Sequence, residues 1–253
     1  MMRLGGKVAI VTGTSPNIGG GIAEGLGEEG AIVACVDVAA DNASQCAEAI
    51  RRRGGTALGL TCDVTDEGQV EAMVARVREA HGGVDILVNN AGTSSAGPFE
   101  KVDDATWVAD IDVKLMAAIR LCRLVIPQMK KRGGGRIVNV TTVGGKVPVA
   151  RALPTSVTRA AGINLTKSLA NEYASDHILV NTVCLGLVKS AQWERRAKGD
   201  LEGYYREVAK RVPVGRVGEA EEFADLVAFL CSARAAYITG TAINFDGGMS
   251  AAF

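Results

Sequence analysis

A short apolar run near the start of the chain leads directly into a glycine-rich turn and a helical segment. The run is residues 8–12, the turn is residues 13–21, and helical sequence follows from Ile22. A β-branched run without polar alternation is typical of a parallel strand buried on both faces. A strand, a glycine turn and a helix N-terminus form an anion site, because backbone N–H groups and the helix dipole converge on a phosphate. The turn is therefore predicted to bind a nucleotide.

Apolar runs and amphipathic segments alternate along the rest of the chain. Further strands are expected at residues 32–36, 57–61, 84–88, 136–140 and 178–184, and within 237–248. Helices are expected at residues 41–53, 66–81, 103–131, from 155 onward, 188–212 and 216–230. This alternation predicts an α/β fold, a single Rossmann-type doubly wound domain over residues 1–253 with a seven-stranded parallel sheet.

Asp37 stands at the carboxyl end of the second expected strand. In a doubly wound fold an acid at this place accepts hydrogen bonds from the adenosine ribose and repels a 2′-phosphate. The residue therefore favours NAD over NADP. A solvated aspartate that caps the next helix is the alternative interpretation.

Three motifs make the whole chain similar to the short-chain dehydrogenase/reductase family, classical type. They are the turn T-G-x-x-x-G-x-G from Thr12, N-N-A-G at residues 89–92, and the D-G-G ending at residues 246–248. In that family a strand ends in a serine, a tyrosine follows thirteen residues later, and a lysine comes four residues after the tyrosine. Here Thr142, Thr155 and Arg159 stand at those positions. The family's asparagine, in W-x-x-x-x-x-V-N, falls on Lys114.

The resemblance also assigns the cofactor contacts. They are Gly13, Asn17, Ile18, Gly19, Asp37, Asp63, Val64, Asn89, Ala91 and Gly92. Asn17 replaces the middle glycine of the turn, and asparagine tolerates positive φ better than most residues. Pro16 removes one N–H donor beside it. We therefore expect NAD to be held weakly, or not at all, by this chain.

The four altered positions remove the family's proton chemistry. Thr142 can still donate a hydrogen bond, but the aliphatic hydroxyl of Thr155 is a poorer acid than a phenol and reaches less far. Arg159 could hold ribose hydroxyls but does not relay protons. Losing positioned acid–base catalysis costs ~10²–10⁴ in rate. No residue is therefore predicted with confidence to be catalytic, and the isolated chain is expected to show negligible dehydrogenase activity.

Three functions remain open. The first is a non-catalytic subunit of an NAD-dependent dehydrogenase that acts on a hydroxy or oxo substrate, in a homo- or hetero-tetramer with an active paralogue, as in 2-(hydroxybenzyl)succinyl-CoA dehydrogenase. The second is an active oxidoreductase or lyase whose acid–base group has moved, for example to Lys114 or Tyr204. The third is a nucleotide-binding sensor. In the family, residues 188–212 correspond to a lid over the substrate.

Composition narrows the possible partners, metal sites and location of the protein. Lys and Arg together number 28, as do Asp and Glu, so charge favours neither nucleic acid nor an acidic membrane as partner. His81 and His177 are far apart in the sequence, and no metal site is expected. The six cysteines have no metal-type spacing and read as small core residues. With no expected signal peptide or membrane helix, a cytoplasmic location is predicted.

Overall fold

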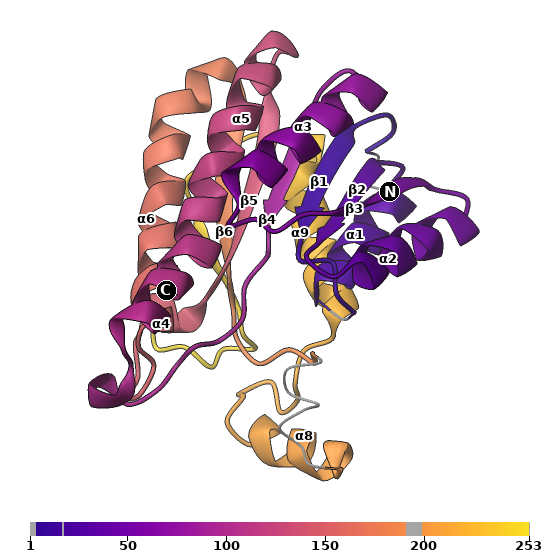
Figure 1. Ribbon diagram of the computed structural model, residues 1–253. Helices are drawn as coiled ribbons and strands as arrows, with labels where there is room; N and C mark the ends of the chain where they lie inside the picture. The colour runs from indigo at the N-terminus through magenta and orange to yellow at the C-terminus, as the bar shows by residue number, and fades with distance from the viewer. Residues whose placement is uncertain (1–3, 17, 191–198, 253) are drawn as a thin grey trace.

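The computed structural model describes residues 4–16, 18–190 and 199–252. Its seven strands form one parallel sheet in the order β3-β2-β1-β4-β5-β6-β7, which confirms the predicted fold class (Figure 1). The strands are β1 (Val8–Thr12), β2 (Ile32–Asp37), β3 (Thr56–Thr61), β4 (Ile86–Asn89), β5 (Gly135–Thr142), β6 (Ile178–Leu185) and β7 (Ala242–Phe245). The strand order reverses between β1 and β4, and a crevice outside the carboxyl ends at such a point is where ligands bind in this fold.

Helices cover both faces of the sheet (Figure 1). One layer contains α1 (Ile18–Glu28), α2 (Ala40–Arg52) and α9 (Ala220–Cys231). The other contains α3 (Glu67–His81), α4 (Asp104–Ile111), α5 (Ala117–Lys131) and α6 (Thr155–Tyr173). Each layer buries its own apolar cluster against the strands, one around Ile22, Ile50 and Phe223 and the other around Val70, Leu121 and Ile178.

Local signals explain where several helices begin and end. Asp66 caps α3 by accepting a hydrogen bond from the Gln69 N–H, and Gly82 ends that helix with φ +78°. Glu219 and Glu222 form a capping box at the start of α9. Short helical turns complete the chain at Phe99–Lys101, Val143–Gly145, Ala174–Asp176 and Ala233–Ala235. The helices expected at residues 66–81 and 216–230 correspond to α3 and α9, and their expected boundaries hold to within about four residues.

The expected long helix at residues 103–131 is not a regular α-helix. Residues Asp112–Met116 form a π-helical turn between α4 and α5. A π turn accommodates one extra residue and is found frequently at functional sites. The apolar spacing of the segment continues through this turn, which is why the sequence indicated a single helix.

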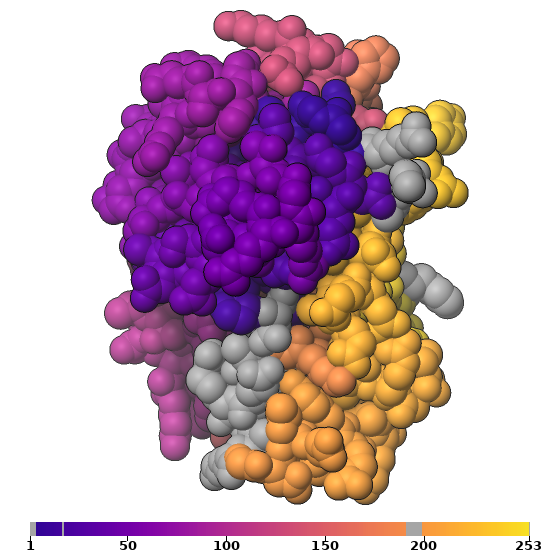
Figure 2. Space-filling view, turned by 90° about the vertical axis from the view of Figure 1, so that its right-hand side faces the viewer, coloured from indigo at the N-terminus to yellow at the C-terminus, as the bar shows by residue number. Residues whose placement is uncertain are grey.

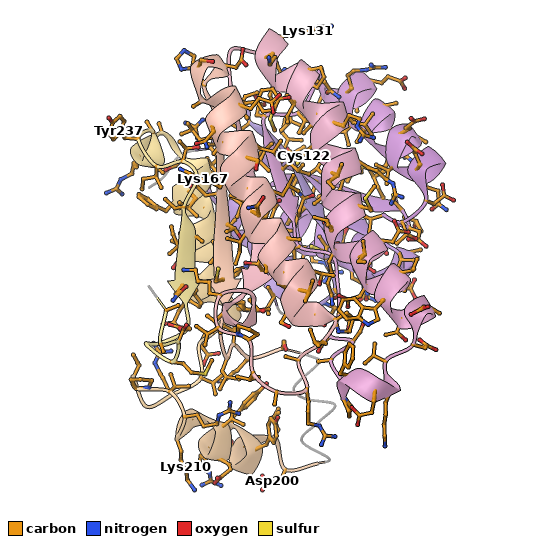
Figure 3. All side chains as sticks on the ribbon, turned by 90° about the vertical axis from the view of Figure 1, so that its left-hand side faces the viewer. Cys122, Lys131, Lys167, Asp200, Lys210 and Tyr237 are labelled. Carbon is orange, nitrogen blue, oxygen red and sulfur yellow. The ribbon has the colours of Figure 1, made fainter. Side chains whose placement is uncertain are left out.

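Helix α8 (Leu201–Ala209) lies beyond the carboxyl edge of the sheet (Figure 1), and the orange atoms of this part of the chain lie at the lower end of the space-filling view (Figure 2). Figure 3 labels the residues on either side of α8, Asp200 and Lys210, at the opposite end of the molecule from Lys131, the last residue of α5. Within its described residues, the expected lid, 188–212, includes helix α8 at this edge. Trp193 and the other residues at 191–198 lie outside the described part of the chain. The lid role stays a prediction.

Three further expectations can be compared with the structure. All six cysteines are buried free thiols, which confirms that they are core residues. Within the described ranges, no helix is long and apolar enough to cross a membrane. The same residues contain no group of three His, Cys, Asp or Glu side chains placed to hold a metal ion.

Candidate functional site

The glycine turn after β1 is built by close backbone contact with the loop after β4. Gly13 has φ +71°, and a Cβ added at Gly19 would lie only 1.8 Å from Gly13 O. The Asn90 amide donates to Thr12 O and Gly13 O, at 3.0 and 2.9 Å. Only glycine fits such an approach, as a turn that brings its backbone to a pyrophosphate requires. Asn17 lies outside the described residues, and Ile18 is the first residue of α1.

The two acids expected to contact the adenosine lie at the carboxyl ends of neighbouring strands, Asp37 at the end of β2 and Asp63 just after β3. Asp37 ends β2 and is buried, and its Oδ1 accepts hydrogen bonds from Ala39 N and Asn42 Nδ2. Asp63 Oδ1 accepts from the backbone and hydroxyl of Thr65. The side chain of Val64 is packed in the core, so only its backbone is placed to meet a nucleotide.

The loop after β4 leads to the altered catalytic positions. Thr12 Oγ1 accepts the Asn90 and Ala91 N–H groups at 3.1 and 3.2 Å. These bonds fix the start of the loop, and Gly92 follows with φ +145°. A Cβ on Gly92 would lie 3.1 Å from Arg159 Nη2 and 3.2 Å from Lys114 Cγ. The structure thus brings the loop, the π turn and α6 to one place.

Lys114 lies in the π turn and directs its ammonium into the protein. Its side chain is 1% exposed and forms an ion pair with Asp110, whose side chain is fully buried. The ammonium also donates to Thr155 Oγ1 at 3.0 Å. Thr158 Oγ1 donates to the other carboxylate oxygen of Asp110 at 2.7 Å. Asp110, Lys114, Thr155 and Thr158 therefore form one hydrogen-bonded group, called here the Lys114 cluster.

Thr155 opens α6, as the sequence predicted. Its hydroxyl oxygen accepts from Lys114 Nζ and from the Ser95 N–H at 3.2 Å. Asp110 Oδ1 lies 3.4 Å away, a long contact for the Thr155 proton. With both lone pairs occupied by donors, this half-buried hydroxyl is oriented to donate. Thr142, which stands at the position of the family's serine, ends β5 and is also half-buried.

The guanidinium of Arg159 contacts the sheet. Its Nη1 donates to Val140 O of β5 at 2.7 Å, so part of the guanidinium is engaged with the sheet. The interpretation that Arg159 holds ribose hydroxyls stays a prediction for the other nitrogens of the guanidinium. The Val140 carbonyl of β5 determines the direction of the Arg159 guanidinium, and no pattern in the local sequence indicates this contact.

Two pKa values are displaced in the cluster. Burial and the nearby Arg159 charge lower the pKa of Lys114, while the bond to Asp110 opposes them. The net result is a pKa of about 8. Burial likewise lowers the pKa of Arg159 to about 10, with the Asp110 charge opposing. Lys114 therefore titrates near neutral pH, where a general acid or base works best.

Asp110 is the functional candidate that sequence reasoning missed. It precedes Lys114 by four residues, a spacing at which acid and base side chains meet on a helix. That i, i+4 spacing was the signal available in the sequence. The other relocated-base candidate, Tyr204, lies on α8 and not in the Lys114 cluster.

Comparison with known proteins identifies the family. Residues 13–250 match the family model described as Enoyl-(Acyl carrier protein) reductase. Oxidoreductase UcpA of Salmonella typhimurium is 37% identical over 98% of this chain and 96% of its own length. The chain belongs to the short-chain dehydrogenase/reductase family.

Two solved structures of relatives are similar over nearly their whole length. L-sorbose reductase of Gluconobacter frateurii, complexed with NADPH and L-sorbose, has a TM-score of 0.96 and 38% identity, covering 100% of this chain and 99% of that one. An NADPH-bound short chain oxidoreductase of Pseudomonas aeruginosa PAO1, described as containing an atypical catalytic center, has a TM-score of 0.95 and 34% identity, covering 99% of each chain.

Proposed function

We propose that this chain is a nicotinamide-dependent oxidoreductase of carbonyl or hydroxy compounds in which Lys114 and Thr155 replace the tyrosine as proton donor. One observation carries the proposal: the buried Lys114 ammonium, with its pKa lowered to about 8, donates at 3.0 Å to a half-buried hydroxyl. A strongly shifted group with a defined partner beside a binding crevice is a mark of an active site. The relatives described as reductases support the same class.

The proton steps follow from the bonds around Thr155. A bound nicotinamide would supply or accept the hydride at the substrate carbon. In the reducing direction, the carbonyl oxygen takes the Thr155 proton, and Lys114 passes one of its protons to Thr155 and becomes neutral. Asp110 holds Lys114 against Thr155 throughout. Thr142 supplies a second hydroxyl that can hold the substrate oxygen. In the oxidising direction, neutral Lys114 takes the proton back through the same hydroxyl.

The test is turnover by the isolated chain with NADH and NADPH on small ketones, sugars and 3-oxoacyl thioesters. The variant Lys114→Gln with Asp110→Asn removes both charges of the buried ion pair, so that neither is left without its partner. We expect it to lose about 10²–10⁴ in kcat, the usual contribution of a positioned acid. The surface variant Lys210→Gln is the control. Equal rates for the two variants would refute the proposal.

For the cofactor, we propose NAD, held weakly. Asp37 supports this choice, because a 2′-phosphate would meet a buried carboxylate. Pro16, which lacks an N–H, supports weak binding at the phosphate turn. The two solved relatives carry NADPH, and the acid at position 37 is the feature on which this chain's preference is predicted to depend.

A second candidate is the non-catalytic subunit of a mixed tetramer. Two observations favour it: the Lys114 ammonium is enclosed by protein, and apolar side chains are exposed on the helices that pack subunits in the family. Val108 on α4 is 66% exposed and Val157 on α6 is 49% exposed. A two-fold interface between like surfaces accepts a close paralogue as readily as a second copy.

Co-expression with an intact paralogue decides between the candidates. If this chain is structural, native mass spectrometry shows mixed tetramers, the isolated chain has no turnover, and variants of Thr142 or Arg159 leave the complex fully active. If the chain is catalytic, the isolated protein turns over and the same variants reduce its rate. A strictly monomeric chain would contradict the structural role.

A further inference from the structure

A cavity of about 290 Å³ lies between α3 and α5. The two helices lie on the same face of the sheet (Figure 1), and the turn after α3 completes the cavity wall. The described wall residues include no member of the Lys114 cluster. Lys131, which is one of them, lies at the opposite end of the molecule from α8 and the carboxyl edge of the sheet (Figure 3). The cavity is therefore separate from the proposed active site.

The central part of the cavity wall is apolar. Val74 of α3 belongs to the buried core, and Leu124 of α5 packs against the same apolar cluster. Ala75 and Pro127 lie beside them in the wall. Sites for small molecules are mostly apolar with a few polar groups, and they measure about 300–1,000 Å³. The cavity is at the lower end of this range and has the size for a small molecule.

Positive charge is concentrated at one end of the cavity. Arg78 lies in the last turn of α3, Lys131 is the last residue of α5, and both are exposed. In the described part of the chain neither forms an ion pair, whereas Arg132 beside them is paired with Asp85. The carboxyl end of each helix carries about half a negative charge, so the two free cations leave a net charge of about +1. This end of the cavity is therefore suited to one anionic group.

Glu71 lies in the wall at the other end of the cavity. It stands two helical turns before Arg78, which is about 10 Å along the axis of α3. Within the described ranges Glu71 has no ion pair either. Its charge repels a second negative group at that end, so the charges favour a ligand with a single carboxylate.

Gln128 adds an acceptor near the positive end. Its Nε2 donates to Leu124 O at 3.1 Å, so the amide oxygen is the atom left over. That Oε1 is buried without a hydrogen-bond partner in the described structure. It lies 3.6 Å from the position of a Cβ added to Gly83, in the turn after α3. An unpaired buried acceptor destabilises the empty site, and a ligand hydroxyl would satisfy it once the amide turns toward the cavity.

We propose that the cavity between α3 and α5 binds a 2-hydroxy acid with a short apolar chain. The carboxylate lies at Arg78 and Lys131, and the hydroxyl on the neighbouring carbon donates to Gln128 Oε1. The apolar chain lies along Val74 and Leu124, toward the other end of the cavity. The site is additional to the proposed active site, and the inference does not depend on turnover.

Calorimetry on the full chain with 2-hydroxyoctanoate tests the proposal. Two related probes each lack one feature: octanoate lacks the hydroxyl, and 2-octanol lacks the charge. We expect 2-hydroxyoctanoate to bind at least about tenfold more tightly than either, because each omits one hydrogen-bonded or charged contact. Its binding should also weaken with added salt, since Arg78 and Lys131 are exposed.

Variants locate the binding site. Arg78→Gln with Lys131→Gln should weaken binding of 2-hydroxyoctanoate by about tenfold or more. Gln128→Leu should remove its preference over octanoate. Ala75→Leu, which fills the cavity from a helical position, should abolish binding, and thermal unfolding checks that the variant is folded. Arg76→Gln is the control, because Arg76 is exposed on α3 but is not part of the cavity wall.

The outcomes separate this inference from the proposed function. Absence of saturable binding by the folded natural chain overturns the site. Binding that is unchanged in the double variant or in folded Ala75→Leu places the probe elsewhere, for example in the active site, and also overturns it. Equal affinity for octanoate and 2-hydroxyoctanoate overturns the role of Gln128. A chain without turnover contradicts the proposed function and leaves each of these measurements decisive.

Discussion

At the scale of single residues, Asp110 and Lys114 depend on each other. Both side chains are buried, and each provides the other's counter-charge. Removing one partner of such a pair costs about 3–5 kcal/mol, because the other charge stays buried alone. The two residues are thus a unit for stability as well as for the proposed chemistry. Any test of Lys114 therefore has to change Asp110 with it.

The lowered pKa of Lys114 predicts the pH dependence of turnover. Reduction requires the protonated lysine, so kcat for reduction should fall as pH rises through about 8, while kcat for oxidation should rise. The free energy of unfolding should also depend on the protonation of Lys114. Between about 8 and 10.5 the unfolded chain binds more protons, so the free energy of unfolding should rise with pH. Steady-state rates measured across this range check the first expectation. A flat profile in both directions would exclude Lys114.

Thr155 gives a test that leaves the buried charges in place. Thr155→Ser keeps the oxygen that accepts from Lys114 and Ser95, and it should retain activity within about tenfold. Thr155→Val removes the oxygen at nearly constant volume and should lose about 10²–10⁴ in kcat. Comparison of kcat for the two variants checks the prediction. Equal loss in both would mean that shape, not the hydroxyl, matters at this position.

At the scale of elements, the turn before α1 is constrained by contact with its neighbours. Gly19→Ala places a Cβ 1.8 Å from Gly13 O and should abolish nucleotide binding, with loss of stability. Gly21→Ala is the matched control on the same helix, because its Cβ would lie 3.4 Å from Ala220. That variant should be neutral or stabilised by about 0.5–1 kcal/mol. Calorimetry with NADH and thermal unfolding measure both effects.

Asp85 joins the start of β1 to the end of α5. It accepts two hydrogen bonds from Arg132, at 2.9 and 2.8 Å, and one from Val8 N at 2.9 Å. Burial opposes ionisation, but these bonds outweigh it and keep the pKa of Asp85 below its usual value. The carboxylate therefore stabilises the fold above its unfolded pKa of about 4, and this stability is lost as pH falls through the lower folded value.

Asp85→Asn should accordingly lower the free energy of unfolding at neutral pH by about 1.5–3 kcal/mol, the contribution of bonds to a charged group. The difference from the natural chain should shrink at acid pH. Denaturant unfolding at neutral and acid pH checks this. Glu207→Gln, in an exposed pair with Lys210, should change little at either pH. A pH-independent effect of Asp85→Asn would contradict the electrostatic account.

These elements also show what a sequence can predict. Strands and the glycine turn depend on residues close in the chain, so their positions were predicted to within a few residues. Asp110 was missed because its importance depends on Lys114 and Thr158, which meet only after α4 and α6 pack. The direction of Arg159 depends on a carbonyl of β5, nineteen residues earlier. Such features require the tertiary structure.

At the scale of the whole molecule, the carboxyl ends of β2, β1, β4 and β5 lie side by side across the reversal in strand order, where a nucleotide is expected to bind. A dinucleotide along them would meet Asp37 at one end and the Lys114 cluster at the other. We predict weak binding with NADH tighter than NADPH, and a reversed or lost preference in Asp37→Ser. Calorimetry with both cofactors checks this. Tighter binding of NADPH by the natural chain would show that Asp37 does not control the choice.

The π turn at Asp112–Met116 has a consequence for the phase of the helix. Successive residues of an α-helix are offset by about 100° around its axis. The turn holds one residue more than a regular α-helix would need over the same angle, so α4 and α5 keep the phase of one continuous helix on either side of it. Deleting one residue from the turn would therefore restore a regular helix with the faces of α4 and α5 still aligned. The surplus residue thus changes the shape of the helix only at residues 112–116, where Lys114 lies.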